Sequence, residues 1–263
     1  MKLLACLIIF IIISCSTVSN TPVFLPSVAQ TEYVMTIEAP DENHTAVQGA
    51  TFDGEYFYTA FIDRSQPKES AIIVKTDKAG VEVAKSEILP LDHANSITVM
   101  KNGNLMIAHC HSIDENYNRF SILDKDSLEI IVTADLAEPC MAIAYCEAKD
   151  QYVSGEWNGE KVNIYDYDLI YTDSFEVDFL PNSTPQSYYC NDDAIYHLRF
   201  THDGGFENYL YSYSHDGKKL LEYKLDLPSD YEAEALSVIE NEVYVMCAAN
   251  QRCEIFKIEH LVI

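Results

Sequence analysis

Three of the chain's eight histidines lie within LDHANSITVMKNGNLMIAHCHS, the segment of residues 91–112. His93 precedes a run of alternating apolar and polar residues, and two more histidines end the next run. Because histidine titrates near neutral pH, His109 or His197 can act as a general acid or base. Imidazole and carboxylate groups also bind zinc, so His93, His109 and Glu234 form a candidate site for a divalent metal. Such chemistry is typical of a hydrolase or lyase, although the sequence contains no GxSxG, HExxH or phosphate-binding loop.

A wider set of polar residues recurs along the chain. Gln48, His93, Gln186 and Glu234 are separated by 45, 93 and 48 residues, and Asn95 follows closely after His93. A second group lies near the ends of other apolar runs and comprises His109, Glu156, Trp157, His197 and Arg199. Together they are the candidate ligand-binding residues. We expect Trp157 to stack on a sugar and the polar groups to form hydrogen bonds. The alternative is that the first group only caps strand ends, because buried polar groups usually find partners.

The elements that carry these residues form a fivefold repeat. Five segments share an alternating run, a polar turn and a second run: QGATFDGEYFYTAF, NSITVMKNGNLMIAHCH, MAIAYCEAKDQYVSGEW, SYYCNDDAIYHLRF and ALSVIENEVYVMCA. The turns DG, NG, KD, DD and EN suit tight hairpins. The second runs recur at intervals of 49, 47, 43 and 48 residues, and each repeat continues into further strand-like runs. Four short strands per repeat of this length are typical of the blades of a β-propeller.

We therefore predict an all-β fold, a single five-bladed β-propeller over residues 31–263. The fifth repeat lacks a fourth strand, and TEYVMTIEA at residues 31–39 can complete it and close the ring. In such blades the start of the first strand and the end of the second lie at the same end of the propeller. Both groups of polar residues should therefore meet at one mouth of the central channel, where function is commonly found.

The amino-terminal residues predict export. MKLLACLIIFIIISCSTVS, residues 1–19, has the pattern of a secretory signal peptide, since its apolar run is too short to span a membrane. The four residues IISC resemble a bacterial lipoprotein cleavage box, which makes Cys15 a candidate for lipidation. Residues 20–30 then form a linker. We expect an exported protein, either extracellular or held at a membrane by a lipid anchor.

Six cysteines remain after this leader, and export permits them to form disulfides. The connectivity of six cysteines cannot be deduced from sequence. Cys247 and Cys253 flank a short loop that a disulfide can close, whereas Cys146 and Cys190 occupy similar places in neighbouring repeats. The alternative is that the cysteines are small buried apolar residues.

The charge of the chain limits its partners. Asp and Glu outnumber Lys and Arg by 42 to 17, and the formal net charge is -25. Nucleic acid is excluded as a partner because its binding requires basic side chains. An anionic membrane surface is also disfavoured, so we expect membrane contact only through a lipid on Cys15. The expected partner is an extracellular glycan or protein, the only cofactor considered is a divalent metal, and the expected state is a monomer.

Three motifs carry a resemblance to known proteins. QG at Gln48, HANSIT at His93 and EAEALSV from Glu232 together resemble exported five-bladed propellers, among them helveticin-like bacteriocins and the propellers of phage receptor-binding and teichoic-acid-associated proteins. The resemblance spans about residues 30–263 and implies a cell-envelope binding role. The acidity of this chain departs from what a binder of an anionic wall polymer needs. Papaya-type glutaminyl cyclases also begin a blade with QG, but this chain has one tryptophan and lacks their tryptophan-rich site.

We therefore predict an extracellular or cell-surface binding module that recognises a glycan, an envelope polymer or a protein at the propeller mouth. The alternative is a propeller hydrolase or lyase that uses the histidines of this mouth. Replacement of His93 and His109 by alanine separates the two classes, because it abolishes turnover by an enzyme but only weakens a binder.

Overall fold

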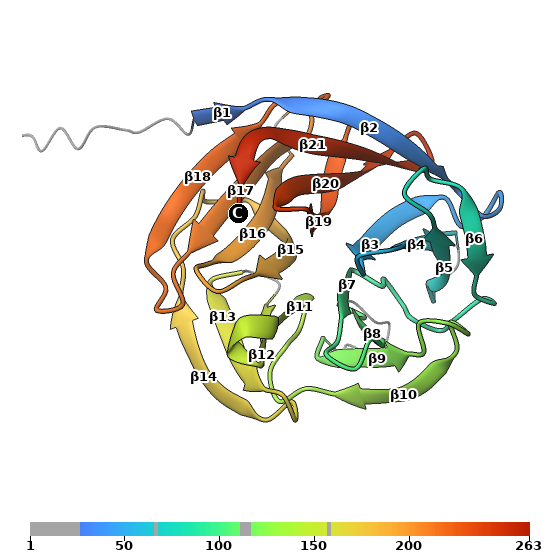
Figure 1. The fold of residues 1–263 in the computed structure, drawn as a ribbon, viewed down its shortest axis with the longest axis horizontal. Helices are drawn as coiled ribbons and strands as arrows, with labels where there is room; N and C mark the ends of the chain where they lie inside the picture. Colours follow the sequence, from blue (N-terminus) through green and yellow to red (C-terminus); the bar gives the residue numbers. More distant parts are fainter. Residues whose placement is uncertain (1–26, 66–67, 111–116, 157–158, 203) are drawn as a thin grey trace, which may run out of the picture.

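The computed structural model describes residues 27–65, 68–110, 117–156, 159–202 and 204–263. The chain forms five β-sheets arranged as blades around a central axis (Figure 1). Four of the sheets have four strands, and the remaining sheet has five. The all-β, five-bladed propeller expected from the repeats is therefore confirmed. Within the described residues no helix is long and apolar enough to cross a membrane.

The blades follow one another in chain order, and in each the strands are ordered from the axis outward. Blade 1 consists of β3 (Ala46–Phe52), β4 (Phe57–Asp63), β5 (Ser70–Thr76) and β6 (Glu82–Lys85). Blade 2 consists of β7 (Ser96–Val99), β8 (Leu105–Ala108), β9 (Arg119–Leu123) and β10 (Ile130–Asp135). Blade 3 consists of β11 (Ala142–Cys146), the 3-10 helix η1 (Glu147–Lys149), β12 (Gln151–Gly155), β13 (Lys161–Asp166) and β14 (Tyr171–Glu176). Blade 4 consists of β15 (Thr184–Cys190), β16 (Ile195–Thr201), β17 (Glu207–Tyr213), β18 (Lys219–Leu225) and β1 (Ser27–Ala29). Blade 5 consists of β19 (Glu232–Ile239), β20 (Glu242–Ala249), β21 (Arg252–Val262) and β2 (Thr31–Glu38).

Blade 5 is closed by the amino-terminal strand β2, as expected for residues 31–39. β2 pairs antiparallel with β21, and Ile37 lies opposite Cys253. Figure 1 shows the blue and red strands side by side. This pairing protects the sheet edge that an incomplete last blade would leave open. β1, from the segment of residues 20–30, pairs in parallel with β18 and extends blade 4 outward.

The hydrophobic core lies between neighbouring blades. Every residue of β4 and β16 is buried, whereas most residues of the outer strands β10 and β14 are exposed or half-buried. Second strands are covered on both faces because a blade lies on each side of them. Tyr58 and Ile73 of blade 1, for example, pack in one cluster with Leu105 and Ile107 of blade 2. Burial of this apolar surface, at about 25 cal/mol per Å², holds the blades together.

Tight hairpins join the first and second strands, as the turn dipeptides predict. Gly103 in the NG turn has a φ of 87°. Glu240 and Asn241 in the EN turn have φ values of 52° and 67°. Positive φ at both central residues of the EN turn matches the twist of the flanking strands, so this hairpin is a regular two-residue turn. The connection in blade 3 differs, because η1 lies between β11 and β12.

One disulfide joins two blades. It connects Cys146, at the end of β11, with Cys190, at the end of β15. The other expected pair does not form: Cys247 and Cys253 are both free and buried. Cys247 packs in the cluster shared with blade 4, and Cys253 packs in the cluster shared with blade 1. Their side chains therefore lie on opposite faces of blade 5, which prevents a staple across the turn.

Candidate functional site

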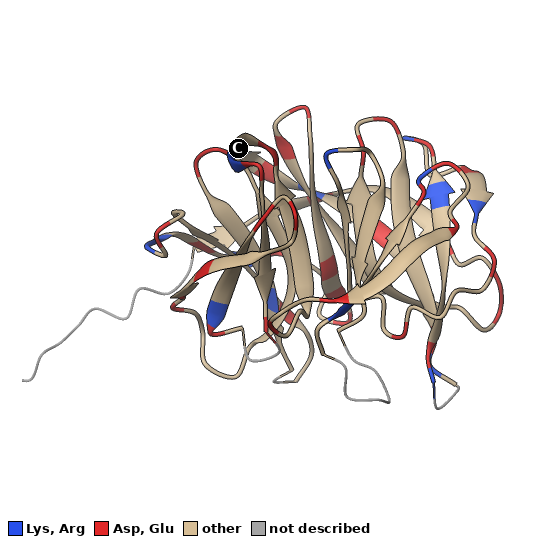
Figure 2. Ribbon diagram, turned by 90° about the horizontal axis from the view of Figure 1, so that it is seen from below, with Lys and Arg blue, Asp and Glu red and all other residues tan. Residues whose placement is uncertain are grey.

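The two ends of the central channel are named here by the first strands of the blades, β3, β7, β11, β15 and β19. These strands begin at the strand-start end, and they turn into the second strands at the hairpin end. The mouth predicted from the sequence is the strand-start end. Figure 2 shows acidic residues along the turns at both ends of the molecule, with fewer basic residues among them.

Hydrogen bonds between blades close the strand-start end. The Gly49 amide donates to the Ala94 carbonyl at 3.0 Å and joins blade 1 to blade 2. Asn95 Nδ2 donates to the carbonyl oxygens of Met141, at 3.1 Å, and Gln186, at 3.3 Å. Asn95 therefore connects blade 2 with blades 3 and 4. A Cβ at Gly49 would lie 2.8 Å from the Ala94 carbonyl oxygen, so this close approach requires glycine in the QG motif.

Blade 5 contributes two glutamates that complete this ring. Gln186 Nε2 donates to Glu232 Oε1 at 2.8 Å, and Gln48 Nε2 donates to Glu234 Oε1 at 3.3 Å. These bonds correspond to the alternative considered from the sequence, in which polar residues bond to one another in the channel. Two acceptors remain: Glu234 Oε2 and Gln186 Oε1 are buried and have no hydrogen-bond partner among the described residues.

Burial disfavours ionisation of these glutamates. Desolvation and the neighbouring Glu232 raise the pKa of Glu234 well above its usual 4.5, and Arg64 opposes this increase. Desolvation also raises the pKa of Glu232. Arg64 and the hydrogen bond from Gln186 act in the opposite direction on that pKa. The charge of Glu232 therefore hinders the ionisation of Glu234, and a ligand cation at this end would oppose that effect.

A cavity gives access to one of these glutamates. It has a volume of about 250 Å³ and is lined by Glu232, the start of β3, the turn between β20 and β21, and Phe206 of blade 4. Glu232 is half-buried, whereas Glu234 is fully buried. A ligand in this cavity can therefore contact Glu232, whereas Glu234 does not line it.

His93 lies at the same end, as predicted, but it is already paired. Its Nδ1 lies 2.6 Å from Glu69 Oε2, in the loop that leads into β5 of blade 1. The pair links blades 1 and 2 and is only partly buried. His93 is therefore within reach of a ligand without being the centre of the site.

His109 is enclosed within blade 2. Its Nδ1 lies 3.1 Å from Asp92 Oδ2, and its Nε2 lies 2.9 Å from Ser121 Oγ. The Ser121 hydroxyl is also 2.8 Å from the Thr133 hydroxyl. A carboxylate, an imidazole and a hydroxyl in this order resemble a catalytic triad. The exposed fractions of Asp92, His109 and Ser121 are only 4%, 1% and 0%.

The structure does not bring His93, His109 and Glu234 together as a metal site. His93 pairs with Glu69 and His109 pairs with Asp92, so each imidazole is bound to a separate carboxylate. In the part of the chain that the structure describes, no three His, Cys, Asp or Glu side chains are grouped so that they can hold a metal ion.

His197 and Arg199 of β16 are buried in the protein interior. His197 stacks on Tyr188 with ring centroids 4.2 Å apart. Burial and the charge of Arg199 lower the pKa of His197 well below 6.5, so it is neutral at pH 7. The guanidinium of Arg199 donates to the Ser183 carbonyl at 2.6 Å and covers the ring of Phe179 at 3.5 Å. These contacts stabilise the chain that enters blade 4.

The remaining predicted residues are placed only in part. Glu156 follows β12 and is half-buried, and its carbonyl accepts a hydrogen bond from the Gly159 amide at 2.9 Å. Trp157, Cys15 and the leader of residues 1–19 lie outside the described residues. Sugar stacking by Trp157 and lipidation of Cys15 therefore stay predictions.

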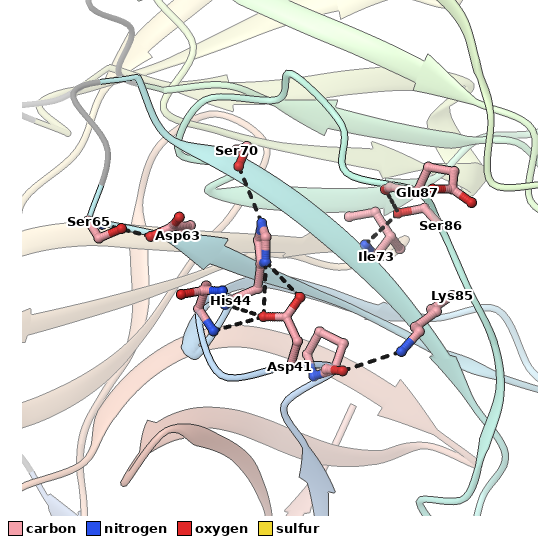
Figure 3. A network of polar contacts seen from close by, with 11 residues as sticks. Asp41, His44, Asp63, Ser65, Ser70, Ile73, Lys85, Ser86 and Glu87 are labelled. Atoms are coloured by element: carbon pink, nitrogen blue, oxygen red, sulfur yellow. Dashed lines mark hydrogen bonds and ion pairs between the residues drawn. The ribbon is translucent and has the colours of Figure 1, made fainter.

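His44 has a structural role that its position in the sequence does not reveal. Its Nδ1 lies 3.0 Å from Asp41 Oδ2, and its Nε2 lies 3.3 Å from Ser70 Oγ (Figure 3). Asp41 also accepts from the backbone amide of His44 at 2.7 Å. This network ties the connection between β2 and β3 to the start of β5. It fixes the point at which the closing strand of blade 5 passes into blade 1.

A second cavity lies at the hairpin end, opposite the predicted mouth. Its volume is about 330 Å³, and the first strand of every blade contributes to its wall. Every blade supplies a hydroxyl-bearing side chain, and blade 4 supplies both Tyr188 and Tyr189. We call one residue from each blade the hydroxyl belt: Thr51, Thr98, Tyr145, Tyr189 and Ser237.

Sequence reasoning missed the hydroxyl belt and the role of Glu232. The belt residues recur at intervals of 47, 47, 44 and 48, which is the blade repeat itself. Glu232 is two residues from Glu234, but the register of β19 shifts between Ala233 and Ala235, so strand alternation does not relate the two side chains. The recurrence of the belt was present in the sequence, but it involves no histidine or tryptophan.

Comparison with known proteins identifies the fold alone. The sequence matches no model of a known protein family and no curated protein. The tail fibre of Staphylococcus aureus phage P68 has a similar structure, with a TM-score of 0.63 and 15% identity over 88% of this chain and 53% of the fibre chain. The β-propeller domain of Myceliophteria thermophila Cps50 (Swd1) has a TM-score of 0.50 and 10% identity over 87% of this chain and 99% of that chain. This chain thus spans about half the length of the tail fibre chain.

Proposed function

We propose that this protein is an extracellular or cell-surface binding module whose strand-start end recognises the amino and hydroxyl groups of a glycan, an envelope polymer or a protein. One observation carries this proposal: the half-buried carboxyl group of Glu232 lines a cavity of about 250 Å³ at this end. A hydrogen bond between a ligand donor and a charged group contributes about 1.5–3 kcal/mol.

The charges at this end favour a cationic donor. Glu232 faces the cavity and is close enough to Glu234 to raise its pKa. An ammonium group supplies both positive charge and three hydrogen-bond donors. An amino sugar or a lysine side chain therefore fits the cluster better than a phosphate or sulfate does.

Location outside the cell is supported by two features. The disulfide between Cys146 and Cys190 is typical of an oxidising compartment. The fold shared with a phage tail fibre is compatible with a role at a cell surface. In this proposal residues 1–19 direct export, and lipidation of Cys15 holds the protein at the membrane.

Calorimetric titration of the purified protein with a glucosamine tetrasaccharide tests the proposal. Replacement of Glu232 by glutamine removes the accessible charge and should weaken binding about tenfold. Glu82→Gln, on the exposed outer strand β6, is the matched control and should bind like the unchanged protein. No detectable binding of the tetrasaccharide, or equal affinity in Glu232→Gln, would contradict the proposed site.

A second candidate function is a hydrolase, and the contacts among Asp92, His109 and Ser121 favour it. It ranks second because all three side chains are buried and the Ser121 hydroxyl also bonds to Thr133. Labelling with a fluorophosphonate probe tests whether Ser121 is a nucleophile. Modification that disappears in Ser121→Ala would establish the hydrolase, whereas an unlabelled protein would exclude a reactive serine.

A further inference from the structure

The hydroxyl belt at the hairpin end has hydrogen-bonding capacity that the protein itself does not use. Ser237 is 4% exposed, and its Oγ has no partner among the described residues. The Thr98 hydroxyl accepts a hydrogen bond from the Tyr145 amide at 3.0 Å and keeps its own proton to donate. A ligand in this cavity must therefore both donate and accept hydrogen bonds.

The two tyrosines of the belt are held in place by neighbouring side chains. Tyr145 donates its hydroxyl proton to Asp150 Oδ1 at 2.7 Å, and Asp150 is paired with Lys101 at 2.7 Å. Tyr189 packs beside Tyr196 with ring centroids 6.1 Å apart. Both belt tyrosines are half-buried, so part of each ring is available for contact. A pre-positioned ring loses little conformational entropy when a ligand packs on it.

A second pocket adjoins the cavity and lies between blades 3 and 4. Its volume is about 400 Å³, and it shares Glu147, Tyr189 and Cys190 with the axial cavity. Cys190 forms the disulfide to Cys146, so the common wall of the two spaces is covalently fixed. A ligand longer than one ring can therefore lie in both spaces, across Tyr189.

The chemistry of these walls selects the ligand class. Sugars carry hydroxyl groups that donate and accept, and they carry C–H faces that pack on aromatic rings. A purely apolar ligand would leave Ser237 without a partner. An anionic ligand would face the exposed carboxylates of Glu147 and Asp192, which line the second pocket.

We propose that the hairpin end is a second binding site, for a neutral oligosaccharide. One sugar unit occupies the axial cavity within the hydroxyl belt, and the next lies in the pocket between blades 3 and 4, against Tyr189. The volume of the axial cavity, about 330 Å³, is in the range of small-ligand sites. This site is independent of the strand-start end and does not use its glutamates.

The test is calorimetric titration of the full chain with neutral tetrasaccharides of glucose, mannose, galactose and N-acetylglucosamine. At least one should bind. Tyr189→Ala should weaken it about tenfold or more, since the ring contacts both spaces. Ser237→Ala removes one hydroxyl without disturbing the fold and should weaken binding about threefold to tenfold. Tyr171→Ala on the outer strand β14 is the matched control and should bind like the unchanged protein.

The outcomes separate this site from the proposed function. The inference is overturned if none of the four sugars binds, or if Tyr189→Ala and Ser237→Ala both keep the original affinity. It is also overturned if Glu232→Gln abolishes binding of the neutral sugar, since the ligand would then occupy the strand-start end. The second site is supported if Tyr189→Ala loses affinity for the neutral sugar while Glu232→Gln keeps it. This conclusion does not depend on whether the glucosamine tetrasaccharide binds.

Discussion

At the strand-start end of the channel, the first strands supply amides and carboxylates that bond to one another across blade boundaries. At the hairpin end the same strands supply hydroxyls around an open cavity. Asn95 bonds to two other blades at the first end, whereas Ser237 Oγ has no partner among the described residues at the second. The comparison teaches that recurrence of polar residues around the axis does not by itself predict ligand binding. What matters is the hydrogen-bonding capacity that remains after the blades have bonded to each other.

The disulfide gives the largest expected effect, and it acts at the hairpin end. Cys146 and Cys190 are separated by 44 residues, and opening a loop of that length costs about 4 kcal/mol of unfolding free energy. We expect Cys146→Ser with Cys190→Ser to lose that amount in urea denaturation and to weaken neutral-sugar binding. Binding of the glucosamine tetrasaccharide should persist. A reductant should destabilise the unchanged protein and leave the double variant unaffected, and any other result would contradict a structural disulfide.

Gly49 gives the next largest effect, at the strand-start end. A Cβ there would lie 2.8 Å from the Ala94 carbonyl oxygen and 2.9 Å from backbone atoms of Ser96. Because the backbone cannot yield as a side chain does, Gly49→Ala should lose about 3 kcal/mol in urea denaturation. Gly103→Ala at the hairpin end has no atom closer than 3.8 Å and tests backbone strain alone, at about 1–2 kcal/mol. Equal losses would show that blade contact is no tighter at the strand-start end.

Replacement of Glu234 should have a smaller effect on stability, and it should stabilise the protein rather than destabilise it. Its pKa is raised in the folded protein, so the folded state holds the proton over a pH range in which the unfolded chain has released it. This stabilisation is complete below the unfolded pKa and is lost as pH rises through the folded pKa. Glu234→Gln keeps an acceptor for Gln48 and should gain about 1–2 kcal/mol at neutral pH.

Thermal unfolding measured from about pH 4 to about pH 8 tests this prediction, because a buried carboxyl group titrates within that window. The melting temperature of Glu234→Gln should depend less on pH than that of the unchanged protein. Glu82→Gln, with an exposed carboxyl on β6, is the control. Parallel curves for all three proteins would mean that Glu234 is not desolvated.

Replacement of Lys101 should have the smallest effect on stability. Its effect on neutral-sugar binding tests whether the hairpin end is a binding site. Lys101 and Asp150 form an exposed ion pair, so Lys101→Ala should shift the melting temperature by less than about 2 °C. Because Asp150 also holds the Tyr145 hydroxyl, the variant should bind the neutral sugar about twofold to threefold more weakly. An unchanged affinity would show that Tyr145 does not need this support.

Much of the fold was predictable from local pattern. The second runs of the repeats, the turn dipeptides and the unassigned segment of residues 31–39 led to five blades closed by β2. These features depend on strand alternation and turn chemistry, which act over a few residues. The site was less predictable: Gln48 and Glu234 do meet, but His109 and His197 are buried in the interior rather than exposed at the mouth.

The sequence by itself therefore determined the number of blades, the closure of the last blade and the end at which Gln48, His93, Gln186 and Glu234 lie. Only the tertiary structure decided which polar groups pair and which keep unused capacity. It paired Gln48 with Glu234, separated Cys247 from Cys253 on the two faces of one blade, and left Ser237 without a partner among the described residues. The physical reason is that local periodicity sets the direction of each side chain. Its neighbours come from blades more than 40 residues away in the chain, and their placement follows from packing of the whole ring.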